Sequence, residues 1–511
     1  MSFNWKLLKD FISKLALDKS LQTDFHQILN KIPQSHDIAE YVKLAEKKIT
    51  FVKQLYNSAA KSDPNANSEE KKAWKTVKRI SQSEHSLDKS SAIQILHNLN
   101  NASNEEDILS EVESFILYLK QHAEMRNNAI KHGAIRILLQ NRLKATTDQT
   151  KEAIREALTI LGYLDPVPKR GIRILSIDGG GIRGVLVLEM LKKLEELTGK
   201  RIYELFDFFC GVSTGAILTY SMGVHMRNLD DIITRYEALS QEIFTQSPLL
   251  GTGKLMWSHA YYNTALWEQK LKDFLGKDTL IMTSRNPKCP KICVVSAVVN
   301  QSRVSAYVFR NYSLPWRFQS EYEGCHDAEI WQAARASAAA PTYFEEFRIN
   351  DLIHQDGGIL VNNPTAIAIH EAKLLWPDTP IQCVVSFGTG RSIPSPRELL
   401  KEKSPKSDGT SWANKFYKIL DSATDTQAVH IMLSDLLPDD VYYRFNPFLT
   451  EVIGIVETDS EKQKQIKRDA LMYLRRNDDK FQQVAKTLMQ QKSVSQKMKE
   501  KANFIRELYG I

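Results

Sequence analysis

The chain has few cysteines, and those it has follow no metal-binding or redox spacing. Five occur among 511 residues, an odd number, and no two of them form a CxxC pair (Cys210, Cys289, Cys293, Cys325 and Cys383). These facts argue against a disulfide scaffold and against a structural zinc site. A reducing, intracellular compartment fits this composition best.

Long apolar runs, calcium-binding loops and targeting signals are also missing. The most apolar stretch, residues 206–222, contains Asp207 and is broken by Gly211 and Gly215, so it predicts a buried strand turning into a helix. No EF-hand loop is present, and we expect no metal and no cofactor. Residues 1–20 are amphipathic but lack the apolar core of a signal peptide, which favours a packing helix over surface attachment. The last residues match no SKL or KDEL address.

Charge is not spread evenly along the chain. The formal net charge is +7, and 25% of the residues are charged. Residues 460–511 contain thirteen Lys and Arg and six Asp and Glu, so this segment alone carries a net charge equal to that of the whole chain. Such a basic helical tail suits an anionic membrane surface or a nucleic acid, and a solvated helix face is an equally weighted alternative.

The first third of the chain is typical of helices. Residues 1–165 contain only two prolines, and apolar residues recur at three- and four-residue intervals. We expect helices at 92–99, 108–119, 129–139 and 152–164. The last two resemble one armadillo-type unit, although no clean internal period is visible and a plain helical bundle remains open.

After two prolines within residues 165–171 the pattern changes to alternating strands and helices. This alternation predicts an α/β sheet with helices on both faces and a mainly helical C-terminal part. We expect three parts, namely a helical region at 1–165, a catalytic domain at 172–370, and a C-terminal part at 371–511 that completes the core and carries the basic tail. The expected strands are 172–178, 205–212, 291–299, 304–310 and 381–387, and the first helices are 185–197, stopped by Gly199, and 214–222.

The segment Gly211-Val-Ser213-Thr-Gly215 follows an expected strand and precedes an expected helix. A G-x-S-x-G sequence in that context forms a sharp turn that lifts the serine hydroxyl above the sheet. Glycines flank the serine because neighbouring backbones approach closely there. The helix N-terminus behind the turn favours negative charge, so Ser213 is a candidate nucleophile.

The loop Asp178-Gly-Gly-Gly-Ile-Arg-Gly184 contains G-x-G-x-x-G after a strand. A dinucleotide site is one reading, but it requires an acidic residue at the end of the next strand, where Ser213 stands instead. The better interpretation is an anion-binding loop whose N–H groups stabilise an oxyanion. The candidate residues are Gly179, Gly180, Gly181, Arg183 and Gly184.

A serine hydroxyl needs a base at neutral pH. Asp356-Gly357-Gly358 stands out, because the two glycines leave the Asp356 carboxylate approachable. A conventional triad with a histidine stays open at this point. His354 would share a strand face with Asp356, and the other candidates are His370 and His430.

The motifs DGGGIRG, GVSTG and DGG, in this order, resemble those of the patatin-like phospholipases. The chain also resembles the calcium-independent phospholipase A2 gamma branch of that family, and this similarity extends from about residue 160 to about residue 490. Four longer segments carry it (ARASAAAPTYFEEF, NNPTAIAIHEAKLLWP, VVSFGTG and LLPDDVYYRFNP). The chain lacks the long N-terminal extension and the peroxisomal signal of some relatives, which leaves its organelle open.

The resemblance implies a patatin-like three-layer α/β/α core and a Ser–Asp dyad without a catalytic histidine. Ser213 is then the nucleophile, Asp356 the proton acceptor, and Gly180 and Gly181 the oxyanion donors, helped by Arg183. We expect metal-independent hydrolysis of fatty-acyl esters of glycerophospholipids. Head-group preference, acyl preference and the ester position attacked are left open.

The expected setting is intracellular, peripheral on a membrane of the endoplasmic reticulum, mitochondrion or peroxisome. The expected partner is a phospholipid surface and not a nucleic acid, with a protein partner for residues 1–165 also possible. Apolar segments 248–257 and 312–318 are candidates for the surface through which lipid reaches Ser213. A catalytically idle lipid-binding protein and a helical interaction scaffold with a secondary lipase domain are the alternatives.

Overall fold

The computed structural model describes residues 92–245, 262–392, 426–451 and 453–510. They all belong to one compact unit, Leu87–Ile511. The expected N-terminal helix within residues 1–20 and the candidate lipid-access segment 248–257 lie outside the described residues.

The centre of the molecule is a mixed nine-stranded sheet with strand order β10-β8-β1-β2-β3-β4-β5, and the hairpin β6–β7 joins it through β7 and β3. From β10 to β3 all neighbours are parallel, whereas β3 is antiparallel to β4 and to β7. Two short strands, β9 and β11, pair separately. The bounds are β1 Ile172–Ile177, β2 Phe208–Val212, β3 Lys291–Val298, β4 Ser305–Arg310, β5 Glu323–Cys325, β6 Phe347–Ile349, β7 Leu352–Asp356, β8 Ile381–Phe387, β9 Arg391–Ser392, β10 Tyr442–Phe445 and β11 Phe448–Leu449.

Side chains alternate between two apolar layers along the central strands. On β1, Leu175 and Ile177 join one core cluster, and Ile172 and Ile174 join the cluster on the opposite face. A strand covered by helices on both faces is buried throughout, and all six residues of β1 are buried, including Arg173 and Ser176. The fold is therefore the expected α/β/α arrangement.

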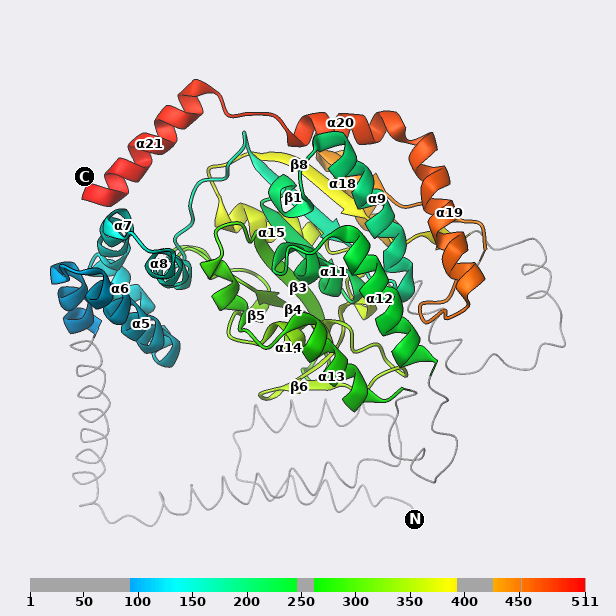
Figure 1. Ribbon diagram of the computed structural model, residues 1–511, viewed down its shortest axis with the longest axis horizontal. Helices are drawn as coiled ribbons and strands as arrows, with labels where there is room; N and C mark the ends of the chain where they lie inside the picture. Colours follow the sequence, from blue (N-terminus) through cyan, green and yellow to red (C-terminus); the bar gives the residue numbers. More distant parts are fainter. Residues whose placement is uncertain (1–91, 246–261, 393–425, 452, 511) are drawn as a thin grey trace, which may run out of the picture. The chain divides into compact units, whose positions relative to one another are not determined.

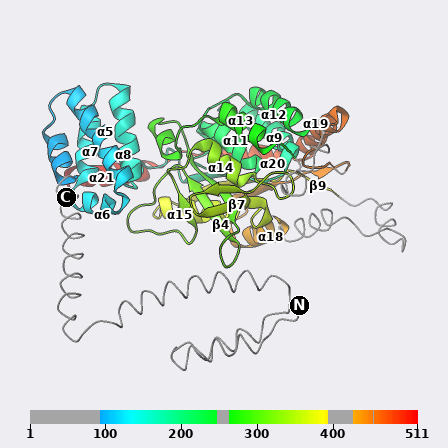
Figure 2. The ribbon, with the colours of Figure 1, turned by 90° about the horizontal axis from the view of Figure 1, so that it is seen from below.

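The two helical layers are visible on opposite sides of the sheet in Figure 2. One face of the sheet is covered by α9, α11, α12, α13 and α14, and on that side α19 and α20 pack against α9 (Figures 1 and 2). The other face is covered by α15 and α18. The bounds are α9 Gly184–Thr198, α10 Ile202–Leu205, α11 Thr214–Gly223, α12 Leu229–Phe244, α13 Thr264–Leu275, α14 Ile330–Ser337, α15 Thr365–Leu375, α18 Thr426–Leu436, α19 Ser460–Arg476, α20 Asp478–Leu488 and α21 Val494–Tyr509, with 3₁₀ turns η2 Gly181–Arg183, η3 Leu280–Arg285 and η4 Gly357–Ile359.

Several expected element ends are corrected. The strand expected at 205–212 begins at Phe208, because Ile202–Leu205 forms the short helix α10. The helix expected at 129–139 is two helices, α6 Arg126–Lys131 and α7 Ala134–Lys144. Gly133 separates them with a φ of 82°, a left-handed conformation that interrupts the helical backbone.

The helical region forms most of a further apolar cluster. The cluster includes residues of a helix at 92–101, α5 Glu105–Gln121, the turn η1 Ala123–Met125, α6, α7 and α8 Asp148–Ile160. Ile281 of η3 and Leu508 of α21 also belong to it. An all-helical arrangement is confirmed here, but an armadillo-type repeat is not. The division of the chain at 165 and at 370 stays a prediction.

A buried carboxylate joins the helical region to the α/β core. Glu156 of α8 is fully buried, and Lys120 of α5 lies 2.6 Å from its Oε1 atom. Arg285, the last residue of η3, forms an ion pair with the same carboxylate, and the Arg155 guanidinium donates to the Arg285 carbonyl at 3.2 Å. The helices and the sheet thus share a charged contact as well as an apolar one.

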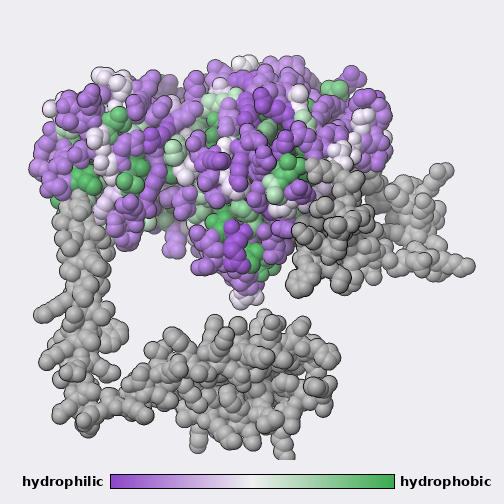
Figure 3. All heavy atoms as spheres, turned by 60° about the horizontal axis from the view of Figure 1, so that its bottom comes forward, coloured by the Kyte–Doolittle hydropathy of each residue, from purple (hydrophilic) through white to green (hydrophobic). Residues whose placement is uncertain are grey.

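The surface in view in Figure 3 is mainly hydrophilic, and its hydrophobic residues form separate small groups. None of the helices described here is long and apolar enough to cross a membrane.

Candidate active site

Ser213 sits in a strained turn between β2 and α11. Its backbone has φ 55° and ψ −120°, a conformation that costs a non-glycine residue about 1–3 kcal/mol. A Cβ atom added to Gly211 would lie 2.3 Å from the Gly215 carbonyl oxygen, and one added to Gly215 would lie 2.3 Å from the Ile177 carbonyl oxygen. The flanking glycines therefore allow the close backbone approach that this turn needs.

Asp356 ends β7 and faces Ser213. The Ser213 hydroxyl donates to the Asp356 Oδ2 atom at 2.6 Å, although the two residues are 143 positions apart. The second oxygen, Oδ1, accepts the Gly358 N–H at 2.7 Å. A Cβ atom on Gly357 would lie 2.3 Å from the Val295 carbonyl oxygen, so the first glycine allows β3 to pass closely.

The Asp356 carboxyl is a weaker acid than usual. Burial raises its pKa from 3.8 to about 6, and the hydrogen bonds from Ser213 and Gly358 offset part of that rise. At neutral pH the carboxylate is ionised and still basic enough to accept a proton.

Among the described residues, no histidine hydrogen-bonds to the Ser213 hydroxyl. His354 is fully buried, shares a 2.9 Å contact with Ser296 through Nδ1, and packs against Tyr307 and Phe309. Burial lowers the pKa of His354 to about 4. His370 packs on the Tyr322 ring, and His430 contacts Tyr442 and Ser434. The histidine triad that the sequence left open has no geometric support here.

The glycine loop follows β1 and lies beside the serine. The Gly179 N–H donates to the Asn362 carbonyl, and the Gly184 N–H donates back into its own turn. Within the described part of the chain, the Gly180 and Gly181 N–H groups make no hydrogen bond. Gly181 has a φ of 57°, and a Cβ atom there would lie 1.9 Å from the Ile455 carbonyl oxygen.

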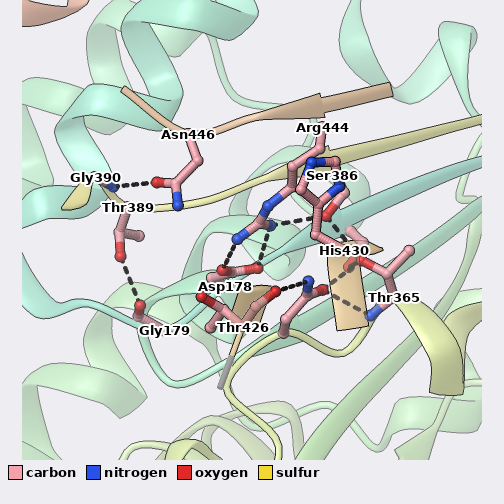
Figure 4. Close-up of polar contacts among 12 residues, drawn as sticks. Asp178, Gly179, Thr365, Ser386, Thr389, Gly390, Thr426, His430, Arg444 and Asn446 are labelled. Carbon is pink, nitrogen blue, oxygen red and sulfur yellow. Dashed lines mark hydrogen bonds and ion pairs between the residues drawn. The ribbon is translucent and has the colours of Figure 1, made fainter. Parts of the chain in front are cut away.

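The loop is held by contacts that sequence reasoning did not predict, shown in Figure 4. Arg444 of β10 donates to both Asp178 oxygens, at 2.8 and 2.5 Å, and to the Ser386 hydroxyl at 2.8 Å. The Thr389 hydroxyl donates to the Gly179 carbonyl at 2.7 Å. Arg444 and Thr389 lie far along the chain from the loop. Both fall in segments that carry the family resemblance, but nothing in those segments predicts a contact with the loop.

Three hydroxyls orient the turn and the loop. The Ser213 N–H donates to the Ser337 hydroxyl at 2.8 Å, and that hydroxyl donates to the Val295 carbonyl at 2.7 Å. The Tyr236 and Thr214 hydroxyls both donate to the Gly181 carbonyl, at 3.0 and 2.8 Å. Their small or aromatic side chains resemble ordinary core residues in the sequence, which is why they were missed.

The serine, the aspartate and the glycine loop line one pocket of about 890 Å³. Arg183 also lines it, and its Nε atom donates to the Gly180 carbonyl at 3.3 Å. One group of lining residues is apolar or aromatic (Ile217, Tyr236, Leu239, Phe244, Trp267, Tyr343 and Phe344), and another is polar (Thr389, Arg391, Thr426, Gln427 and Asn446). Residues 312–318, expected at the access surface, do not line this pocket. Several of them line a separate hollow with Arg126 and His326.

The ranges that the structure describes contain no candidate metal site. No group of three or more His, Cys, Asp or Glu side chains there is arranged to hold a metal ion. All five cysteines are free thiols.

An α/β/α core that carries a strand–serine–helix turn, an aspartate and a glycine loop defines a class of serine acyl hydrolase folds. Residues 175–369 match the family model described as patatin-like phospholipase. This part of the chain is therefore similar to the patatin-like phospholipases.

Its curated relatives agree with that placement. The chain is 45% identical to calcium-independent phospholipase A2-gamma of Mus musculus over 403 residues, which cover 78% of this chain and 51% of that protein. Identity with the Homo sapiens protein of the same name is also 45%, covering 50% of that protein. Phospholipase A I of Arabidopsis thaliana is 31% identical over 386 residues, 63% of this chain and 29% of that protein. The chain thus spans about half the length of the mammalian relatives.

The resemblance seen in the sequence motifs is confirmed. Among solved structures, human GIVD cytosolic phospholipase A2 aligns with 11% identity over 69% of this chain and 63% of that chain. The TM-score of this alignment is 0.32.

Proposed function

We propose that this chain hydrolyses fatty-acyl esters of glycerophospholipids, with Ser213 as the nucleophile and Asp356 as its proton acceptor. The observation that carries the proposal is the 2.6 Å contact between the two side chains in a pocket that the glycine loop also lines. The identity with proteins named calcium-independent phospholipase A2-gamma supports the choice of substrate.

In the proposed reaction, Asp356 accepts the Ser213 proton as Oγ attacks the ester carbonyl carbon. The Gly180 and Gly181 N–H groups, with Arg183 nearby, stabilise the oxyanion, and one such donor is typically worth about 3–4 kcal/mol of barrier. The tetrahedral intermediate collapses to an acyl-serine, and the lysolipid alkoxide leaves with the proton from Asp356. Water then attacks the acyl-serine carbonyl while Asp356 accepts its proton. As the second tetrahedral intermediate collapses, the bond to Ser213 Oγ breaks, Asp356 returns the proton to Oγ, and the fatty acid leaves.

The remaining motif residues have proposed supporting roles. Gly211 and Gly215 shape the turn around the nucleophile, and Gly179 and Gly184 shape the ends of the glycine loop. Gly357 and Gly358 position the Asp356 carboxylate. The reaction needs no Lewis acid in this scheme, because the serine supplies the nucleophile and the loop supplies the oxyanion donors.

The pocket supports a lipid with a charged head group. Its apolar group of residues suits an acyl chain, and its polar group includes Arg391. The Arg391 guanidinium lies 3.9 Å from the Phe448 ring centroid, and no carboxylate among the described residues pairs with it. We assign Arg391 to the phosphate of the head group, because a guanidinium binds phosphate well when no acid competes for it.

The proposed setting follows from the substrate. Phospholipids are held in bilayers, so the protein acts peripherally on an intracellular membrane, whose identity the sequence leaves open. Residues 172–370 form the proposed catalytic domain, residues 371–511 complete its core, and residues 1–165 are the proposed helical region, available to a protein partner.

The test is fatty-acid release from mixed phospholipid vesicles in excess chelator. We expect release by the unaltered protein, a loss of roughly 10³-fold or more in Ser213→Ala, and a loss of roughly 10²–10⁴-fold in Asp356→Asn. Ser320→Ala, a serine hydroxyl outside the pocket, is the matched control and should keep normal turnover. Near-normal turnover by Asp356→Asn would remove the aspartate from the mechanism. Absence of release by the folded, unaltered protein would favour an idle lipid-binding protein.

A further inference from the structure

Helix α21 packs only one of its faces against the rest of the molecule. It begins after a capping box at Ser493 and ends at Gly510. Its inner side lies on α7, where Leu508 is buried, Phe504 is partly buried, and Gln140 donates to the Leu508 carbonyl at 3.1 Å. The helix is therefore anchored, and its outer side faces solvent.

The outer side carries an apolar stripe. Val494, Met498, Ile505 and Tyr509 are 68%, 67%, 42% and 61% exposed, and Ala502 is exposed between them. At 3.6 residues per turn, these five positions fall within a sector of about 80°. Large apolar side chains aligned in this way on a folded surface indicate an interaction site.

Basic side chains border the stripe on both sides. Lys497 and Lys501 follow one edge of the sector, and Lys499 and Arg506 follow the other. All four are exposed, and none forms an ion pair with another described residue. Of the two acids on the helix, Glu500 forms an ion pair with Lys492.

The rest of the basic tail differs from α21. On α19, Lys462, Lys464 and Lys467 form ion pairs with Glu457, Glu461 and Glu237 respectively. Helices α19 and α20 also pack against α9 and belong to the core. Exposed Arg468, Arg475 and Arg476 on α19 form no ion pair with a described residue, and Leu471 and Met472 are 51% and 47% exposed there. Helix α21 differs in that its exposed apolar residues form a stripe of five positions along the helix.

We propose that the outer face of α21 lies in the surface of an anionic lipid bilayer, with the apolar stripe among the acyl chains and the four basic side chains at the lipid head groups. An amphipathic helix with a narrow apolar sector between Lys and Arg residues binds such a surface in its plane. The flanking charge favours anionic lipid over a second copy of this positively charged chain. This docking does not depend on the Ser213–Asp356 reaction.

The experiment measures binding of the full-length chain to vesicles of diether phosphatidylcholine, with and without diether phosphatidylserine, by flotation. Ether lipids contain no acyl ester, so binding is separated from hydrolysis. The stripe variant is Met498→Glu/Ile505→Glu, and the charge variant is Lys499→Gln/Lys501→Gln. Leu117→Glu, at a residue of α5 that is 57% exposed, is the matched control.

We expect the unaltered chain and Leu117→Glu to bind the phosphatidylserine vesicles equally, and binding to weaken as salt is raised. The charge variant should bind about 25-fold more weakly, which is about five-fold for each lysine, and the stripe variant should lose binding. Each variant's hydrolysis of a soluble short-chain ester should match that of the unaltered chain, which verifies folding.

Unchanged vesicle binding by a folded stripe variant would overturn the proposal. So would an equal loss in Leu117→Glu, because the effect would then not be specific to α21. A chain that is dimeric in solution and becomes monomeric in the stripe variant, with vesicle binding unchanged, would identify a second copy as the occupant instead.

Discussion

Asp356 combines two demands that usually conflict in one carboxylate. It must be ionised to accept a proton, and it must be a strong enough base to take one from a hydroxyl. Burial at the end of β7 raises its pKa to about 6, and the Gly358 N–H keeps the ionised form in place. In the proposed mechanism, Asp356 thereby takes the part that a histidine plays in a triad.

The first prediction concerns the pH dependence of hydrolysis. Because protonated Asp356 accepts no proton from Ser213, kcat/KM should fall about ten-fold for each pH unit below about 6 and level off above it. A pH profile on a soluble ester measures this apparent pKa. A profile that stays flat down to pH 5 would contradict the assignment of Asp356 as the base.

The same shift predicts a change in stability. The folded state holds its Asp356 proton more tightly than the unfolded state, so this stabilisation is complete below pH 3.8 and is lost as pH rises through about 6. At neutral pH the buried, ionised Asp356 carboxylate therefore lowers the free energy of unfolding by on the order of 3 kcal/mol. Relative to the unaltered chain, Asp356→Asn should therefore gain about that much unfolding free energy between pH 4 and pH 7. Urea unfolding at both values measures the gain, and a constant difference would contradict it.

A third residue-level prediction addresses the head group. Arg391→Gln should raise KM for a phospholipid about ten-fold, because a charge-assisted hydrogen bond to phosphate is lost, and should leave kcat nearly unchanged. KM for a diacylglycerol, which has no phosphate, should not change. Equal effects on both substrates would assign Arg391 a structural role only.

At the scale of elements, strand β10 fixes the glycine loop through the buried Arg444–Asp178 ion pair. Arg444→Met leaves the Asp178 carboxylate buried without a partner, and we expect a loss of about 3–5 kcal/mol in unfolding free energy. Arg444→Met/Asp178→Asn should be less destabilised than the single variant, because no unpaired charge remains. Urea unfolding compares the two, and a double variant as unstable as the single one would contradict this account.

Most strands and helices of the core could be predicted from the sequence, because their burial leaves a direct pattern. Strand β1 is buried throughout because helices cover both faces, and four of its six residues are Ile or Leu. Helix α9 ends at Gly199, which has a φ of 65°. The break at Gly133 was missed, because the apolar spacing continues across it. Helix α10 was missed because its four residues are too few to show a period.

The residues of the candidate site likewise fall into two groups, those that the sequence predicts and those that it does not. The motifs around Ser213, Gly181 and Asp356 are local, since a sharp turn or a close approach requires glycine beside each of them. Ser337 and Arg444 act through contacts across 124 and 266 positions. Such contacts leave no periodic or compositional trace, so only the folded structure reveals them.

At the scale of the whole molecule, the helical region is joined to the core through Glu156. Glu156→Gln weakens the charged contact with Lys120 and Arg285, and we expect a loss of roughly 1–3 kcal/mol in unfolding free energy with faster amide hydrogen exchange in α8. Glu152→Gln, one turn earlier on α8, is the control. Turnover of a soluble ester should not change, and unchanged exchange in α8 would show that apolar packing alone holds the helices.

The dependence of the glycine loop on β10 has a consequence for synthesis. The loop and the serine turn leave the ribosome before Arg444, which follows Asp178 by 266 positions. Until that later segment has been translated and has joined the sheet, Asp178 has no counter-ion and the oxyanion donors are not held in place. We therefore expect the proposed hydrolysis to begin only after the segment around Arg444 has been translated and has paired with β8.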